Sequence, residues 1–288
     1  MLGRYIYRKL SADSGNEIYG TGRSNSFFSD LNDYFQGDLC NDDFIHTISS
    51  IDYDSIVHCA ALVNLNTCET DYDLAEAIHV TASKNLALAN PNATFLYIST
   101  DSIFNGEAIH RTEIDEVEPL NVYALTKYLG GKAVRENHAK AYDLRLNIYG
   151  FKEPLGASLF EWAYKSMSNN QPINGYDNVT FNPLYAGQIA EVVSNFITHQ
   201  PEFGIYHLGC DKGLSKYEFV MKMADVFDLD KALITKFSAN FDNSKINRPY
   251  HTTMNTNKLK TTFPYLDLSF ESGFEQLKKD IRQLDIRS

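Results

Sequence analysis

The sequence has little of what proteins stabilised by metals or disulfides need. Its 288 residues include only four cysteines, and no two of them have the spacing of a CxxC motif. Zinc sites and redox-active cysteine pairs usually show such spacing. We therefore expect inert thiols, no disulfide and no metal site. The four are Cys40, Cys59, Cys68 and Cys210.

Positive charge and long apolar runs are also scarce. The chain has 26 Lys and Arg against 37 Asp and Glu, a net charge of −11, and no basic stretch offsets it. Nucleic acids bind to basic surfaces, so they are not expected partners. No apolar run approaches the ~20 residues of a membrane span, and the sequence does not open on a signal peptide. We expect a cytoplasmic protein without membrane contact.

A glycine-rich turn is missing where the rest of the chain predicts one. Residues 1–10 predict a helix, with Leu2, Ile6 and Leu10 at helical spacing. A dinucleotide-binding fold places a strand and a turn with several glycines before this helix, and here only Gly3 stands in that region. Two explanations stay open. Either further residues are encoded upstream, or the protein has lost its phosphate-binding turn and serves as a binding or regulatory subunit.

The stretch from Phe95 to Lys127 carries most of the chemistry that is present. A short apolar run predicts a strand that ends in Thr100 and Asp101, at the edge of the sheet where ligands bind in open α/β folds. Tyr123 and Lys127 follow, four residues apart on one face of a predicted helix.

This spacing suits acid–base chemistry at a carbon–oxygen bond. A free tyrosine has a pKa of about 10, and an ammonium group one turn away lowers that value. The Thr100 hydroxyl can bond to the same substrate oxygen as the Tyr123 phenol. Thr100, Tyr123 and Lys127 are therefore our candidate catalytic residues for a hydride transfer.

The combination resembles the extended short-chain dehydrogenase/reductases, and most of all their dTDP-4-dehydrorhamnose reductase branch. That family reads roughly Ser-Thr-Asp-Tyr-Val-Phe-Asp-Gly where residues 99–106 read STDSIFNG, and Pro-Leu-Asn-Val-Tyr follows at 119–123. The resemblance covers nearly the whole chain. It departs at the glycine-rich turn and at Gly130-Gly131, where the family tends to have Gly-Glu.

The resemblance implies an α/β fold, a Rossmann-like doubly wound parallel sheet with an interleaved smaller substrate lobe. Residues 1–150 and 184–209 would form the nucleotide-cofactor lobe. Residues 151–183 and 210–288 would belong mainly to the substrate lobe.

Several residues would contact NADP or NAD. Arg23, just past a predicted strand, suits the 2′-phosphate of NADP, although a solvated loop arginine is the alternative. By resemblance, Gly3 closes the phosphate turn, Asp38 and Leu39 lie beside the adenine, and small residues after the next strand let backbone approach the cofactor. Tyr123 and Lys127 would also contact it. The small residues are Ala60 and Ala61.

The same resemblance implies reduction of a 4-keto nucleotide-sugar, with Thr100, Asp101 and Arg248 as substrate-binding residues. Arg248 is the candidate contact to the diphosphate, or else a surface arginine. Arg145 is either a buried ion-pair partner or a ligand contact. The Tyr-x-x-x-Lys helix would also be the surface of a possible homodimer.

Two other functions stay open. One is a sugar-nucleotide epimerase or dehydratase. Dehydratases of the resembled superfamily usually place Asp-Glu beside the hydroxyl residue, whereas Asp101 is followed here by Ser102, which favours a reductase. A non-catalytic NADP-binding regulatory subunit would fit the missing turn but not the intact catalytic set.

Periodicity and capping predict the remaining elements, with Asn121 as the cap of one helix and Ser215 with Glu218 as the capping box of another. An acidic flap is expected at 107–118, a loop at 62–70, and a loop with a hairpin strand at 172–181. The predicted helices are 1–10, 43–50, 73–90, 121–136, 158–168, 186–198, 215–227 and 271–284, and the predicted strands are 17–22, 55–58, 95–98, 141–146, 204–209 and 234–237.

Overall fold

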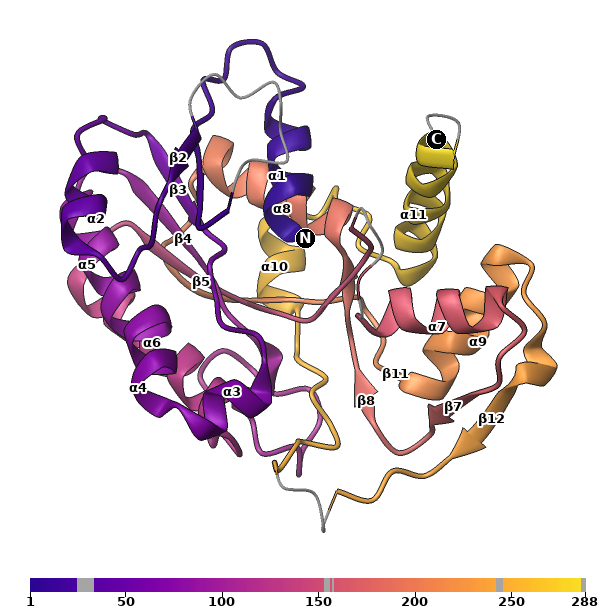
Figure 1. Ribbon diagram of the computed structural model, residues 1–288. Coiled ribbons are helices and arrows are strands. Elements are labelled where there is room, and N and C mark those ends of the chain that lie inside the picture. Colours follow the sequence, from indigo (N-terminus) through magenta and orange to yellow (C-terminus); the bar gives the residue numbers. More distant parts are fainter. Residues whose placement is uncertain (25–33, 153–155, 157, 242–245, 286–288) are drawn as a thin grey trace.

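A four-stranded parallel sheet forms the centre of the computed structural model (Figure 1). The structure describes residues 1–24, 34–152, 156, 158–241 and 246–285. The strands lie in the order β10-β5-β4-β3, which confirms the predicted α/β parallel-sheet fold. Their bounds are Ser55–His58 for β3, Thr94–Ile98 for β4, Ala141–Leu146 for β5 and Gly204–Leu208 for β10.

Side chains alternate between two cores because successive residues of a strand point to opposite faces. Leu96 and Tyr142 pack on one face, and Phe95 and Tyr97 pack on the other. Helices cover both faces, as in a doubly wound sheet. The first face meets α1 (Leu2–Leu10) and α8 (Ala186–His199), and the second meets α2 (Asp42–Ile48), α5 (Ala82–Ala89) and α6 (Val122–Asn137).

Two short strands stand apart from this sheet. β1 (Gly20–Gly22) pairs in parallel with β2 (Tyr34–Gln36), and the pair forms a sheet of its own. The predicted strand 17–22 is therefore shorter than expected, and β2 was not predicted. Both strands are three residues long, too short for a clear alternation of apolar and polar residues.

The region 62–90 is more helical and more broken than predicted. The expected loop 62–70 contains α3 (Leu65–Thr70), which Asn64 caps by accepting a hydrogen bond from the Thr67 amide. The single helix expected at 73–90 is instead α4 (Tyr72–Glu76), a π-helical turn η1 (Ala77–Thr81) and α5. Apolar periodicity cannot distinguish a π-helical turn from the α-helix around it.

Small sheets and helices form the other side of the molecule, to the right in Figure 1. The hairpin expected at 172–181 is wrong, because β7 (Ile173–Tyr176) pairs in parallel with the distant β12 (Ile234–Phe237). The remaining elements there and nearby are β6 (Ile148–Tyr149), α7 (Leu159–Ser168), β8 (Thr180–Phe181), β9 (Leu184–Tyr185), β11 (Leu214–Ser215), α9 (Lys216–Phe227), η3 (Lys231–Leu233), α10 (Asn257–Thr262) and α11 (Phe270–Asp285).

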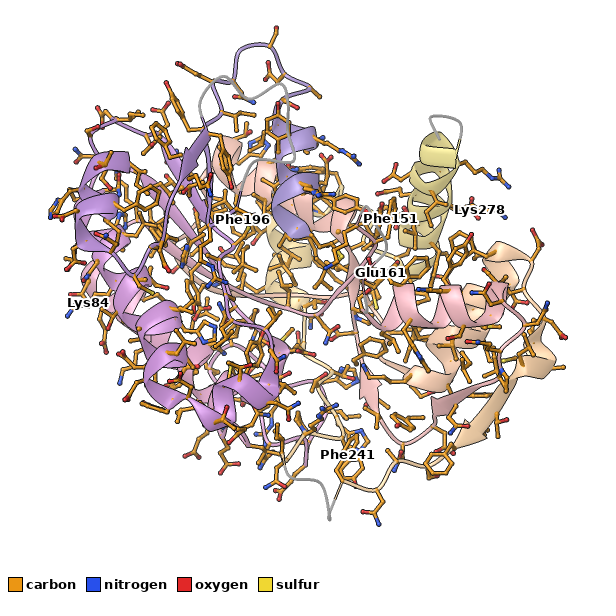
Figure 2. The ribbon with its side chains drawn as sticks, viewed as in Figure 1. Lys84, Phe151, Glu161, Phe196, Phe241 and Lys278 are labelled. Carbon is orange, nitrogen blue, oxygen red and sulfur yellow. The ribbon has the colours of Figure 1, made fainter. Side chains whose placement is uncertain are left out.

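Aromatic side chains fill much of the interior. Phe196 of α8 is fully buried and meets Tyr142 and Tyr206 in edge-to-face contacts, whereas Lys84 projects outward from α5 (Figure 2). Edge-to-face ring pairs stabilise a core beyond the area that they bury. Within the described residues no helix is long and apolar enough to span a membrane, and no three His, Cys, Asp or Glu side chains gather as a metal site would require.

Candidate active site

Thr100 and Tyr123 meet at the carboxyl end of β4. Thr100 caps the short 3-10 helix η2 (Asp101–Ile103), and its Oγ1 accepts a hydrogen bond from the Ser102 amide at 3.2 Å. Tyr123 lies in the first turn of α6, which Asn121 caps as predicted by accepting from the Ala124 amide at 2.9 Å. The Thr100 side chain lies close enough to the Tyr123 phenol for a hydrogen bond that lowers the pKa of Tyr123. The fold thus brings two predicted catalytic residues together from separate elements.

The phenol of Tyr123 is held in its neutral form. Burial raises the pKa of Tyr123 to about 12, and the hydrogen bond with Thr100 offsets only part of this effect. The ring of His79 approaches the Tyr123 ring edge-on, with centroids 5.8 Å apart. A neutral phenol at pH 7 can donate a proton, which is what reduction of a ketone requires.

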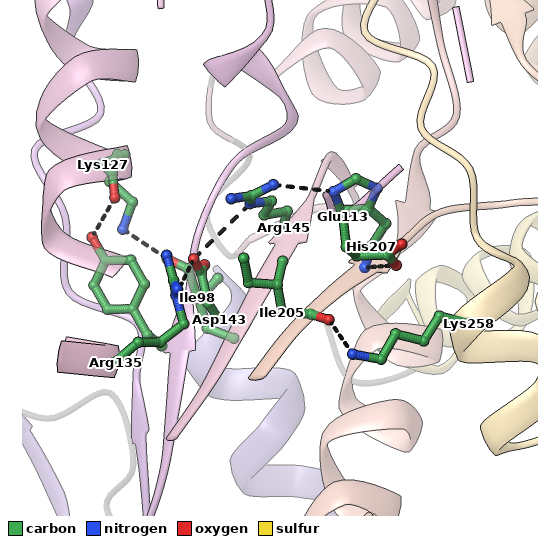
Figure 3. A network of polar contacts seen from close by, with 10 residues as sticks. Ile98, Glu113, Lys127, Arg135, Asp143, Arg145, Ile205, His207 and Lys258 are labelled. Carbon is green, nitrogen blue, oxygen red and sulfur yellow. Dashed lines mark hydrogen bonds and ion pairs between the residues drawn. The ribbon is translucent and has the colours of Figure 1, made fainter. Parts of the chain in front are cut away.

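Lys127 lies one turn further along α6 and points into the protein. Its Nζ donates to the backbone oxygen of Ile98 at 2.7 Å and sits 4.1 Å from the Tyr97 ring centroid (Figure 3). Burial lowers the pKa of Lys127 to about 7, although the carboxylate of Asp143 opposes this. The predicted lowering of the Tyr123 pKa by Lys127 is wrong for this structure, because burial raises the pKa of Tyr123 and the Lys127 ammonium is bound to the Ile98 oxygen.

His79 was not singled out from the sequence, yet it supports this site from the π-helical turn η1. Its Nε2 accepts a hydrogen bond from the Leu62 amide at 2.9 Å, so its Nδ1 carries the proton and donates to Thr126 Oγ1 at 2.8 Å. Burial lowers the pKa of His79 to about 3, which keeps the ring neutral. His79 thereby ties the chain after β3 to the helix that carries Tyr123.

The sequence differs from the pattern of the resembled family at Gly130-Gly131, and close packing explains the difference. A Cβ on Gly130 would lie 2.0 Å from the backbone oxygen of His79, and one on Gly131 would lie 2.7 Å from Asp143 Oδ2. Glycine at both positions lets α6 approach the π-helical turn and β5 closely.

A second group of polar side chains surrounds Asp101, the residue after Thr100. Asp101 is fully buried, and burial raises its pKa although Asn147 Nδ2 donates to Asp101 Oδ2 at 2.8 Å. Lys216, the first residue of α9, interacts electrostatically with both Asp101 and the exposed Arg248. Asn147 and Lys216 were missed because no motif marks them; only the fold brings them to Asp101.

Two cavities are candidate ligand sites, and neither lining includes Thr100, Tyr123 or Lys127. The larger, of about 1240 Å³, is lined by all six residues predicted to contact a cofactor outside α6: Gly3, Arg23, Asp38, Leu39, Ala60 and Ala61. The smaller, of about 590 Å³, lies between α7, β7 and α9, and its lining includes Trp162, Tyr176 and Lys216.

Arg145 belongs to a buried polar network behind the site (Figure 3). Its guanidinium lies 3.9 Å from Asp143 Oδ2 and 3.4 Å from His207 Nε2, and burial lowers its pKa. The His207 amide in turn donates to Glu113 Oε1 at 3.1 Å. Of the two roles considered for Arg145, the ion pair is observed, and Glu113 anchors the acidic 107–118 segment to β10.

The family profile of the RmlD substrate binding domain matches residues 1–283. The chain belongs to this family. The beta subunit of methionine adenosyltransferase 2 from Mus musculus is 29% identical over 288 residues, covering 96% of this chain and 84% of that protein. The spore coat polysaccharide biosynthesis protein SpsK of Bacillus subtilis is 26% identical, covering 73% of each chain.

Solved structures of this RmlD-like kind share the fold. The dTDP-4-dehydrorhamnose reductase of Bacillus anthracis, solved in complex with NADP, superposes with a TM-score of 0.84 at 23% identity, covering 97% of this chain and 94% of that one. These matches confirm the resemblance inferred from residues 99–127. They do not test the roles of individual residues, which stay predictions.

Proposed function

We propose that this RmlD-like protein reduces the C4 ketone of a nucleotide-linked deoxysugar with NADPH or NADH. The observation that carries the proposal is the placement of Thr100 at the carboxyl end of β4 beside Tyr123, in the first turn of α6, with Lys127 one turn further along that helix. Family membership and the likeness to a reductase solved with NADP support it. The similarity to SpsK supports a place in polysaccharide biosynthesis.

In this proposal each catalytic side chain has a separate role, which its protonation state determines. The dinucleotide would supply the hydride to C4. Thr100 would orient the ketone oxygen, and the neutral Tyr123 phenol would give its proton to the nascent alkoxide. Lys127, moved off the Ile98 oxygen, would hold the nicotinamide ribose.

The residues proposed to contact the adenine half of a dinucleotide line the large cavity. Arg23 and Asp38 are exposed at its rim, and Arg23 favours the 2′-phosphate of NADP. Ala60 and Ala61 follow β3 and leave its end uncovered by large side chains.

The substrate nucleotide would lie on the opposite side, over α9. Lys216 interacts electrostatically with both the buried Asp101 and Arg248, and the two cations suit a diphosphate. The smaller cavity next to Lys216 offers the Trp162 and Tyr176 rings to a base. Asp101 followed by Ser102 continues to favour reduction over dehydration.

Replacement of Tyr123 by Phe tests the mechanism. NADPH oxidation in the presence of a dTDP-4-keto-6-deoxy sugar should fall by about 100-fold or more in Tyr123→Phe, the usual loss on removing a general acid. Tyr128→Phe on the same helix is the matched control, since Tyr128 packs against Phe104 and Met254 and takes no proposed part. Reduction that survives in Tyr123→Phe would exclude this mechanism.

A second candidate function is a nucleotide-binding subunit of a larger enzyme. The similarity to the beta subunit of methionine adenosyltransferase 2 favours it. Such a subunit would bind an adenosyltransferase equally well as wild type and as Tyr123→Phe. Pull-down with a methionine adenosyltransferase catalytic subunit, run beside the reduction assay, separates the two functions.

A further inference from the structure

The side chain of Asp143 reaches the underside of α6 from β5 (Figure 3). In the parallel ladder of β4 and β5, Asp143 stands opposite Tyr97, so the two side chains point to the same face of the sheet. That face packs against α6, because the Tyr97 hydroxyl donates to the backbone oxygen of Lys127 at 3.2 Å. The Lys127 ammonium in turn lies 4.1 Å from the centroid of the Tyr97 ring. Tyr97 therefore has Lys127 and Asp143 as neighbours, from a helix and from a strand.

Gly131 makes room for the Asp143 carboxylate under the helix. Lys127 and Gly131 are four residues apart in α6, so they lie on one face of the helix, one turn from each other. A Cβ on Gly131 would lie 2.7 Å from Asp143 Oδ2 and 3.0 Å from Oδ1. The carboxylate thus occupies the space that a side chain at position 131 would take, one turn along α6 from Lys127.

The two oxygens of the Asp143 carboxylate differ in their partners. Asp143 is 1% exposed, and its Oδ2 lies 3.4 Å from Arg135 Nε and 3.9 Å from Arg145 Nε. Among the described residues, Oδ1 has no hydrogen-bond partner. A buried negative charge is costly unless positive charge lies near it. The Lys127 ammonium is close enough to interact with this carboxylate electrostatically.

The other titratable groups around the Lys127 ammonium are neutral at pH 7. Burial lowers the pKa of each histidine there to about 3 and raises those of the thiol and the two phenols above their usual values. These groups are His58 and Cys59 at the end of β3, His79 in η1, Tyr97 on β4 and Tyr123 on α6. Burial lowers the pKa of Lys127 to about 7, and Asp143 is the group that opposes this most.

We propose that Asp143 is a positioning residue of the candidate active site, and that its carboxylate supplies the negative charge that stabilises the Lys127 ammonium under α6. The consequence for catalysis rests on the proposed reduction, in which that ammonium holds the nicotinamide ribose. Asp143 is buried and lines neither of the two cavities, so it acts through Lys127 and not by contact with a ligand.

The titration of Lys127 itself tests the proposal, in the whole protein and without substrate. Lysine labelled with carbon-13 at Cε reports the charge of each ammonium by NMR, and the Lys127 signal is the one that Lys127→Met lacks. Asp143→Asn removes the charge and keeps the size of the side chain. We expect it to move the midpoint of the Lys127 titration to lower pH by about one unit or more, as loss of a nearby opposite charge does.

A second readout and a control separate this effect from general damage. The reduction rate should decline toward alkaline pH earlier in Asp143→Asn, by the same shift, because a neutral Lys127 holds the ribose less well. Glu113→Gln is the matched control, since Glu113 belongs to the same buried network through the His207 amide but is not among the groups that act on Lys127. It should leave the Lys127 midpoint unchanged, and an equal shift in this control would overturn the proposal.

Two further variants keep the test decisive if Asp143→Asn does not fold. Asp143→Ala combined with Gly131→Glu returns a carboxylate to the same space from α6 and should bring the midpoint back to within a few tenths of a unit of wild type. Arg135→Met removes a half-buried cation that competes for the Asp143 charge and should move the midpoint to higher pH. A midpoint that stays unchanged in folded Asp143→Asn, or in Arg135→Met, would contradict the proposal. If the midpoints move as expected but wild type reduces no keto sugar, the proposed function fails and the action of Asp143 on Lys127 stands.

Discussion

Protonation at single residues sets the chemistry of the candidate site. Burial moves the pKa of Tyr123 up and that of Lys127 down, so both groups are drawn toward their neutral forms. His79 is also neutral and forms two hydrogen bonds that fix its tautomer. The site is therefore built to hold uncharged donors, and charge at Lys127 is the property that solution conditions change most easily.

Lys127 should give the stability of the protein a measurable pH dependence. Its pKa is about 7 in the folded protein and about 10.4 when unfolded, so between these values the unfolded state binds more protons. The free energy of unfolding should therefore rise with pH above 7, by up to about 1.4 kcal/mol per pH unit. Urea denaturation of wild type and Lys127→Met at about pH 7 and pH 8.5 checks this. Parallel pH profiles for the two proteins would contradict it.

At the scale of elements, α6 packs closely against the π-helical turn η1. Gly130 allows it, and Tyr97 adds hydrogen bonds from its hydroxyl to the backbone oxygens of His79 and Lys127 at 3.4 and 3.2 Å. This contact positions the helix that carries Tyr123 against the sheet.

A single added methyl group should disturb that contact. Gly130→Ala places a Cβ against the His79 oxygen and should cost about 1–3 kcal/mol of stability, as overpacking usually does. Gly3→Ala is the matched control, because a Cβ there meets nothing within 4 Å and alanine favours a helix. Thermal unfolding of both variants gives the comparison, and equal melting temperatures would show that α6 can shift without cost.

The elements also show what the sequence could and could not predict. The strand end at Thr100, the cap at Asn121 and the capping box of Ser215 and Glu218 were predicted because each depends on neighbours within a few residues. The π-helical turn and the pairing of β7 with β12 were not, because they depend on contacts between distant segments. Asn147 and Lys216 were missed for the same reason.

At the scale of the molecule, a buried polar network ties the sheet to the segments around it. Asp143 and Arg145 lie on β5, His207 on β10, Arg135 on α6 and Glu113 on the acidic segment (Figure 3). Buried charges are costly when a partner is lost, so this network should respond strongly to substitution.

Arg145→Met should lower the free energy of unfolding by about 3 kcal/mol, because it leaves Asp143 with only the more exposed Arg135 as its ion-pair partner and His207 without its contact to the guanidinium. Arg135→Met is the control, since the Arg135 side chain is 27% exposed and its loss should cost less. Urea denaturation measures both variants. If Arg135→Met proved the more damaging, the exposed pair rather than the buried one would hold this region together.

Trp162 is the single tryptophan of the chain, and it stands 41% exposed on α7 at the smaller cavity. Tryptophan emission from the intact protein therefore comes from one known position, beside Lys216. A nucleotide that enters this cavity would change the colour or intensity of that emission, whereas a dinucleotide in the larger cavity does not touch Trp162. The protein thus carries an intrinsic optical reporter for one of its two cavities.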